Sequence, residues 1–250
     1  MCVAAGEKVA ILGANGCGKS TLLKLLDGLY FPSQGELFAF GQRLSEAAFQ
    51  DEVFHFAFRR QVGLLFQDSD VQLFSPSVWD EVAFAPLQMG LGKDEVVERV
   101  ESALKTLRIE SLRERAPHRL SGGEKKRVAL ASLLSLDPAV WLMDEPTAGL
   151  DPRSAAWLDD FIYDQGEHGR TIVIATHDLG LVESITERVY LFDEQHQITA
   201  EGPTDEILSN HALLVACNLV PGHIHTRETR KRAATHLMDD NPPPHDASIG

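Results

Sequence analysis

The chain has 250 residues, of which 44% are hydrophobic, and a formal net charge of −14 at pH 7. This length and apolar content suffice for one large α/β core. The acidic balance argues against a protein that wraps nucleic acid, because such a surface is basic. No run approaches the roughly 20 apolar residues of a membrane-spanning helix. Three scattered cysteines, Cys2, Cys17 and Cys217, are typical of a reduced protein without disulfides.

Residues 9–26 carry the most specific motif in the chain. An apolar run at 9–12 predicts a buried strand, and residues 22–26 predict a helix. The string GANGCGKST lies between them, and its glycines let backbone N–H groups converge on phosphate oxygens. We expect Lys19 to reach the β- and γ-phosphates and the Ser20 hydroxyl to ligate Mg²⁺. The candidate nucleotide-binding residues are Gly13, Ala14, Asn15, Gly16, Cys17, Gly18, Lys19, Ser20 and Thr21.

The next segments indicate a strand followed by a helical insert. A strand-like run begins at residue 62 and ends in Gln67. Apolar residues then recur on one helical face, opposite charged side chains, over residues 95–107. We interpret residues of about 75–135 as a mostly helical insert whose apolar stripe belongs to the core.

Residues 120–128, LSGGEKKRV, open a further helix. Ser121 and Glu124 have the spacing of a capping box, which alone predicts only a well-capped helix. Glycine, however, costs about 1 kcal/mol in a helix relative to alanine. Two glycines at an exposed helix start favour close approach of an anion to the backbone. We therefore expect a second phosphate-facing helix end, formed by Leu120, Ser121, Gly122, Gly123 and Glu124.

Two later strands are predicted to end in reactive side chains. Residues 139–145 end in Asp144 and Glu145, and residues 171–177 end in His177. Ligands of open α/β sheets lie at the carboxyl ends of the strands. Asp144 could hold Mg²⁺ through water, Glu145 could orient or deprotonate a water, and His177 could contact the γ-phosphate. Without the phosphate loop, these residues would suggest only an acidic turn and a surface histidine.

The segment from about His211 onward has a different composition. It contains His223 and His225, a basic cluster at 227–232 and three prolines at 242–244. Few apolar residues and consecutive prolines predict a solvated, poorly ordered tail over 211–250. Two histidines without a further fixed ligand make a weak transition-metal site.

Taken together, these motifs resemble those of ATP-binding cassette (ABC) ATPases over roughly residues 1–210. The string at 13–21 is similar to the Walker A loop, and residues 120–124 are similar to the signature motif. The resemblance implies a P-loop NTPase: an α/β fold with a RecA-like core, a mostly parallel sheet and a helical insert. It also implies a partial antiparallel β subdomain, which lacks its first strands here.

The resemblance also implies a role for each candidate residue. Glu145, His177 and Gln67 would be catalytic, and Asp151 would belong to the D-loop. Mg²⁺ would be held by Ser20, Gln67 and Asp144, and ATP and Mg²⁺ would be the cofactors. Members of the family carry an aromatic residue before the phosphate loop that stacks on adenine. The twelve residues before Gly13 contain none. Either the true start of the protein lies upstream of Met1, or its adenine site is open. In the second case we expect similar affinities for ATP and GTP.

A narrower resemblance is carried by FQDSDVQLF at 66–74 and SVWDEVAFAP at 77–86. Both are similar to the energy-coupling-factor branch, the ATPases of vitamin and cobalt or nickel importers. It implies a peripheral subunit at the cytoplasmic face of the membrane, with no nucleic-acid partner. Its partners would be a second ABC ATPase, either a copy or a paralogue, a transmembrane coupling subunit and a substrate-binding membrane subunit.

The same resemblance implies a working mechanism. Two ATPases would pack head to tail, with each ATP between the Walker A loop of one and the signature motif of the other. A groove lined by Leu73, Phe74 and Trp79 would grip a helix of the membrane subunit. The alternative is a soluble ABC ATPase of iron–sulfur cofactor assembly, which would purify with soluble partners.

Overall fold

The computed structural model describes residues 1–221, and Met1–Leu219 form one compact unit. The histidines at 223 and 225, the basic cluster and the prolines predicted for the tail lie outside the described residues. None of the helices in residues 1–221 combines the length and the apolar character needed to cross a membrane.

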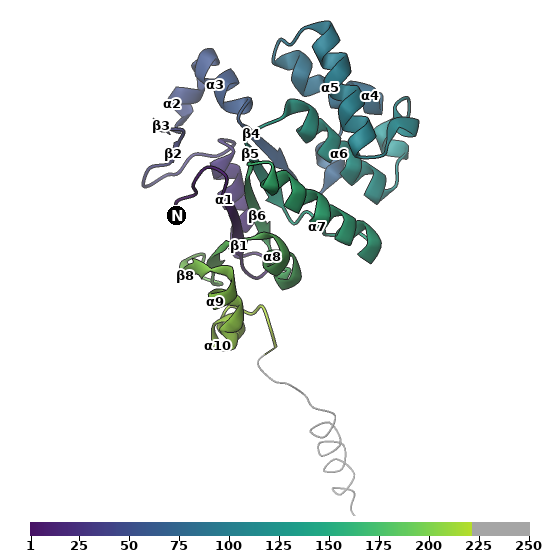
Figure 1. The fold of residues 1–250 in the computed structure, drawn as a ribbon. Coiled ribbons are helices and arrows are strands. Elements are labelled where there is room, and N and C mark those ends of the chain that lie inside the picture. Colours follow the sequence, from purple (N-terminus) through teal and green to yellow (C-terminus); the bar gives the residue numbers. More distant parts are fainter. Residues whose placement is uncertain (222–250) are drawn as a thin grey trace, which may run out of the picture. The chain divides into compact units, whose positions relative to one another are not determined.

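A six-stranded sheet forms the centre of this unit, with the strand order β4-β5-β6-β1-β7-β8 (Figure 1). Neighbouring strands from β4 to β7 run parallel, and β8 lies antiparallel to β7 at one edge. Leu12 pairs with Thr176 and Asp144 pairs with Ala175, so β1, β5 and β6 end close together. The strands are Lys8–Leu12 (β1), Val62–Leu65 (β4), Val140–Asp144 (β5), Thr171–Thr176 (β6), Arg188–Phe192 (β7) and Ile198–Pro203 (β8).

Helices connect the strands, and many of them begin at a side chain that caps the first turn. Ser45, Asp51, Ser77, Asp151 and Asp178 each accept hydrogen bonds from backbone N–H groups at a helix start. The helices are Lys19–Leu26 (α1), Glu46–Phe49 (α2), Glu52–Arg59 (α3), Val78–Gln88 (α4), Lys93–Thr106 (α5), Gly122–Leu136 (α6), Pro152–Glu167 (α7), Leu179–Ile185 (α8), Thr204–Ser209 (α9) and His211–Ala216 (α10).

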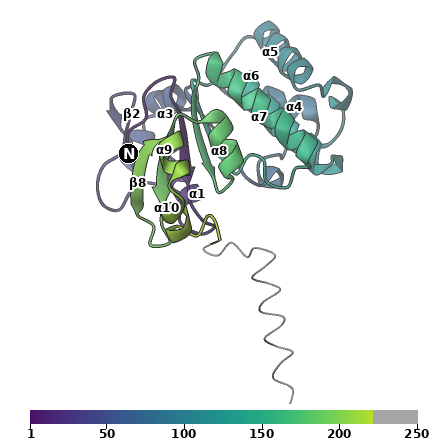
Figure 2. The ribbon, with the colours of Figure 1, turned by 60° about the horizontal axis from the view of Figure 1, so that its bottom comes forward.

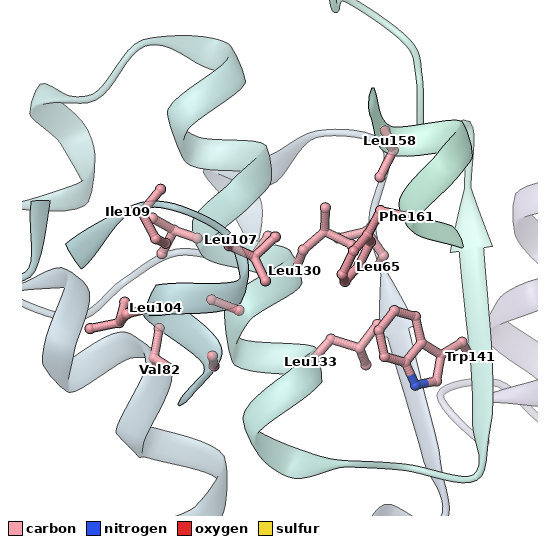
Figure 3. Packing of buried hydrophobic residues seen from close by; sticks show 14 of the residues in the cluster. Leu65, Val82, Leu104, Leu107, Ile109, Leu130, Leu133, Trp141, Leu158 and Phe161 are labelled. Carbon is pink, nitrogen blue, oxygen red and sulfur yellow. The ribbon is translucent and has the colours of Figure 1, made fainter. Parts of the chain in front are cut away.

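Two apolar clusters cover the two faces of the sheet, because side chains alternate along each strand. Trp141 and Met143 of β5 face a cluster built with α6, α7 and α8, part of which is shown in Figure 3. Leu142 between them faces the opposite cluster, which contains Leu23 of α1 and Phe58 of α3. The parallel strands β1, β5 and β6 are buried on both faces, as expected for a covered parallel sheet. The predicted α/β class is therefore confirmed.

The helical insert occupies the β4 end of the sheet. Helices α4, α5 and α6 pack on one another there (Figure 2), and α6 also contacts β4. Val82, Leu104 and Leu130, one from each helix, belong to the same buried cluster. The apolar stripe predicted for residues 95–107 is buried in α5, where Val96, Val100, Ala103 and Leu104 have almost no exposed surface.

The small antiparallel sheet is very short. It consists of the two-residue strands Phe38–Ala39 (β2) and Gln42–Arg43 (β3). Aromatic rings rather than strand pairing hold this region, since Phe49 makes edge contacts with Phe54 and Phe58. Phe40 and Gly41, with φ angles of 52° and 76°, form the tight turn between β2 and β3.

The compact unit extends beyond residue 211, where the sequence predicted the tail to begin. The chain continues as α10 from His211 to Ala216, with Asn210 capping its first turn. Leu214 and Cys217 are only 3% and 2% exposed, so this helix belongs to the compact unit, which extends to Leu219. Composition averaged over the tail concealed the short apolar segment ALLVA at its start.

Candidate active site

The glycine-rich loop joins the end of β1 to the start of α1 in conformations that require glycine. Gly16 and Gly18 have φ angles of 84° and 103°, in the left-handed region that other residues rarely adopt. At Gly13 a Cβ atom would lie 2.6 Å from the Cys17 sulfur, which leaves no room for a side chain. The loop therefore presents the N-terminus of α1, an anion-binding geometry, at the edge of the sheet.

Lys19 places a buried positive charge beside this loop. Its side chain is 6% exposed, and its ammonium donates to the carbonyl oxygens of Gly13, at 2.8 Å, and Ala14, at 3.1 Å. The same nitrogen lies 3.5 Å from the Glu145 carboxylate. The charge thus sits between the phosphate loop and the tip of β5, where the β- and γ-phosphates of a nucleotide would need it.

Asp144 ends β5 with its carboxylate beside the Ser20 hydroxyl. Burial raises the pKa of Asp144, and the hydrogen bond from Ser20 opposes this rise. Its Oδ1 atom is buried and has no hydrogen-bond partner within residues 1–221. A buried carboxylate oxygen with a free lone pair, next to a serine hydroxyl, suits a hard cation such as Mg²⁺. These two residues therefore fit the predicted metal ion.

Glu145 follows Asp144 in a strained backbone conformation. Its φ of 43° is left-handed, which is uncommon for a residue with a side chain and clusters at functional sites. The carboxylate accepts a hydrogen bond from the Thr176 hydroxyl at 2.8 Å and lies 2.8 Å from Nδ1 of His177. Thr176, the last residue of β6, and His177, which follows it, therefore fix the orientation of the glutamate. The buried carboxylate thus lies beside Lys19, at the edge of the phosphate loop.

The predicted second phosphate-facing end is the start of α6. Ser121 and Glu124 form the complete capping box, and the Ser121 contacts hold the pKa of Glu124 below its usual range. Gly122 has open space where a Cβ would lie, and a Cβ on Gly123 would lie 4.0 Å from the Ser154 hydroxyl. Asp151 caps α7, the helix that contains Ser154. The start of α6 and the Asp151 turn are therefore neighbours.

The structure groups some candidate residues and separates others. Lys19, Glu145 and His177 are joined by direct contacts, and Asp144 lies beside Ser20. Residues 120–124 share no hydrogen bond or ion pair with residues 13–21 in the described chain. Gln67 is exposed two residues beyond β4, the neighbour of β5, so it emerges at the same sheet edge as Asp144.

Two residues that touch this site were not singled out from the sequence. Thr176 stood within a predicted strand, and Lys126 stood within the string at 120–128, without a role of its own. Lys126 is in fact 4% exposed, and its ammonium donates to the carbonyl oxygen of Gln67 at 2.9 Å. Its spacing from the buried Leu130 and Leu133 places it on the buried face of α6. Burial lowers the pKa of Lys126 to about 8.

A glycine-rich loop between a buried strand and a helix, beside two carboxylates at a neighbouring strand tip, defines a P-loop nucleoside triphosphatase. A family model described as ABC transporter matches residues 1–148. This chain therefore belongs to the ABC transporter family, of which it is an ATP-binding cassette with ATPase activity.

Named relatives agree with this membership. The nickel import ATP-binding protein NikO of Rhodobacter capsulatus is 51% identical over 220 residues, covering 87% of this chain and 86% of that protein. The energy-coupling factor transporter ATP-binding protein EcfA of Methanocaldococcus jannaschii is 42% identical over 214 residues, covering 86% and 75%. The structure of cbiO1 from Clostridium perfringens, described as part of the ABC transporter complex cbiONQ, is 35% identical. It covers 96% of this chain and 90% of its own, with a TM-score of 0.73. The resemblance to the energy-coupling-factor branch is confirmed.

Proposed function

We propose that this chain is the ATP-hydrolysing subunit of an energy-coupling-factor importer that takes up a transition-metal ion, cobalt or nickel, or a vitamin. The observation that carries this proposal is a pair of exposed aromatic rings, one in the loop that follows Gln67 and one on α4. Phe74 and Phe84 are 67% and 42% exposed, and their rings meet edge to face with centroids 4.9 Å apart. One relative is named as a nickel import protein and another as an energy-coupling factor transporter protein, and both names support this proposal.

The chemistry proposed for the site uses six side chains. Lys19 would bind the β- and γ-phosphates. Ser20 and Asp144, together with Gln67, would hold Mg²⁺, which would neutralise charge on the phosphate oxygens. Glu145 takes the proton of the attacking water because its carboxylate is already oriented by Thr176. His177, half-exposed beside Glu145, contacts the γ-phosphate.

A second ATPase subunit, a copy or a paralogue, completes the site in this proposal. The glycines at the start of α6 are accessible and make no contact with residues 13–21 of the described chain. Their anion-binding geometry would therefore serve the nucleotide of the partner. Asp151, beside the start of α6, would lie in the same interface.

The surface proposed to dock the membrane subunit shares only Phe74 with the groove expected from the sequence, because Leu73 and Trp79 pack against the core. Trp79 is half-buried in the core, and the Arg113 guanidinium lies 4.4 Å above its ring. Phe74, Phe84 and the 56%-exposed Leu87 are the accessible apolar side chains instead. Such contiguous apolar surface next to polar residues is typical of a protein contact site.

A co-purification experiment tests this proposal. Replacement of Phe74 and Phe84 by alanine should abolish association with membrane subunits but leave ATP binding unchanged. Phe56→Ala, which removes an equally exposed ring on α3, should have no effect. Uptake of labelled cobalt, nickel or vitamin by the intact transporter would then identify the cargo. Retained association of the double variant, or association only with soluble proteins, would favour the alternative of a cofactor-assembly ATPase.

A further inference from the structure

The loop that carries Gln67 is tied to α6 and α4 by charged side chains. We name residues 66–75 the Q segment. Lys126 donates to the carbonyl oxygens of Phe66, at 3.3 Å, and Gln67, at 2.9 Å. Farther along, Lys125 pairs with Asp70. These contacts connect the Q segment to the first turns of α6, which begin at the signature glycines.

Lys126 is an unusual residue for such a contact. It is 4% exposed, and no carboxylate in residues 1–221 lies within 4.0 Å of its ammonium. Burial of an ammonium without an ion-pair partner costs several kcal/mol, whereas an apolar side chain of similar length would fill the space at no such cost. Asp68 and Asp144 attract the charge only from a distance. The lysine therefore provides hydrogen bonds that an apolar residue could not supply, and both are to the Q segment.

The position of Lys126 on α6 gives these hydrogen bonds a mechanical consequence. The residue lies four positions after Gly122, the first residue of α6, within the first two turns of the helix. The Ser121–Glu124 capping box fixes the start of the helix to the same turns. A displacement of the signature glycines along α6 would therefore displace the Gln67 carbonyl as well.

We propose that Lys126 is a positioning residue that fastens Gln67 to the signature end of α6, so that the two move as one unit. The proposal rests on the roles proposed above for Gln67 and for residues 120–124. ATP bound to the partner at the start of α6 would then set the place of Gln67 in this subunit. Each nucleotide would influence hydrolysis of the other through one buried lysine.

ATP hydrolysis by the purified chain tests this proposal with three variants. Lys126→Met keeps the length and burial but removes the donors, Lys126→Arg keeps the donors, and Lys105→Met removes an exposed lysine of α5 as the control. Lys126→Met should lower kcat by about tenfold to a hundredfold, as misplacement of a catalytic group does. Its KM and its melting temperature should change little, because the phosphate loop is untouched. Lys126→Arg should recover most of the turnover, and Lys105→Met should match the wild type.

Other results would overturn the proposal. Normal turnover of a folded Lys126→Met protein, or a matching loss in Lys126→Arg, would show that the lysine does not position Gln67. If Lys126→Met does not fold, Lys126→Gln, which retains one amide donor group, should give intermediate turnover, and wild-type turnover there would contradict us. Gln67→Ala distinguishes the proposed role of Gln67 from the proposed role of Lys126. If that variant is fully active, the role of Gln67 is wrong; if it is inactive while Lys126→Met is active, only the role of Lys126 is wrong.

Discussion

The Nδ1 atom of His177 lies 2.8 Å from the Glu145 carboxylate, although the two residues follow different strands. They meet because β5 and β6 are parallel neighbours whose carboxyl ends share one edge of the sheet. The contact joins the residue proposed to activate water to the residue proposed to touch the γ-phosphate. A change in the phosphate could therefore reorient the glutamate through the histidine.

Removal of this histidine should affect hydrolysis far more than binding. We expect His177→Ala to lower kcat by about 10² to 10³, the usual loss when one group that stabilises the transition state is removed. Nucleotide affinity should remain similar, since the phosphate loop supplies most of the contacts. His168→Ala, at the exposed end of α7, is the matched control. Equal turnover in both variants would show that His177 has no part in the reaction.

A second prediction concerns the contact between α1 and α3. The Asp27 carboxylate is buried and pairs with Arg59 at 2.8 Å, yet burial outweighs the arginine and raises the pKa of Asp27 to about 6. The folded state then binds this proton more tightly than the unfolded state, whose aspartate pKa is about 3.9. The contribution of Asp27 to stability is therefore greatest below about pH 4 and falls as pH rises to about 6.

Urea unfolding of the wild type and of Asp27→Asn across this range checks the prediction. The free energy of unfolding of the wild type, relative to the variant, should decrease by up to about 3 kcal/mol between pH 4 and pH 7. The asparagine does not titrate, so it isolates the contribution of this one group. A difference between the two proteins that is independent of pH, or that increases with pH, would contradict the prediction.

The third prediction concerns the loop before α4. Glu81 is 4% exposed, and one of its carboxylate oxygens accepts hydrogen bonds from the N–H groups of Phe74 and Ser75, at 2.9 and 2.7 Å. Glu81→Ala would leave both donors without this partner and should lower the free energy of unfolding by about 2 to 4 kcal/mol. Glu98→Ala, on the exposed face of α5, should stay within about 0.5 kcal/mol of the wild type. Equal stability of the two variants would exclude this role for Glu81.

The sequence predicted the elements whose pattern is local. The strand before Gly13, the helix after Lys19 and the capping box at Ser121 all depend on residues close together in the chain. So does the apolar stripe of α5. Because parallel strands share an edge, the proximity of Asp144 and His177 could be predicted as well.

What depends on long-range packing could not be predicted. Lys126 reaches a loop 59 residues earlier in the chain, and Trp79 is covered by Arg113 rather than exposed in a groove. The helix α10 escaped notice because its six residues are too few to show a period. For Lys126 and Trp79, the residues that pack against the side chain, and not the residue type itself, determine its surroundings.

Glu145→Gln tests the central claim most directly, because glutamine keeps the size of the side chain but cannot accept the proton of water. We predict that this variant binds ATP as the wild type does and accumulates as an ATP-dependent dimer in size-exclusion chromatography. Its kcat should fall by about 10² to 10⁴, the contribution of a general base. Near-normal ATP turnover in the folded variant would contradict the account, since the buried carboxylate beside Thr176 and His177 would then have no role in hydrolysis.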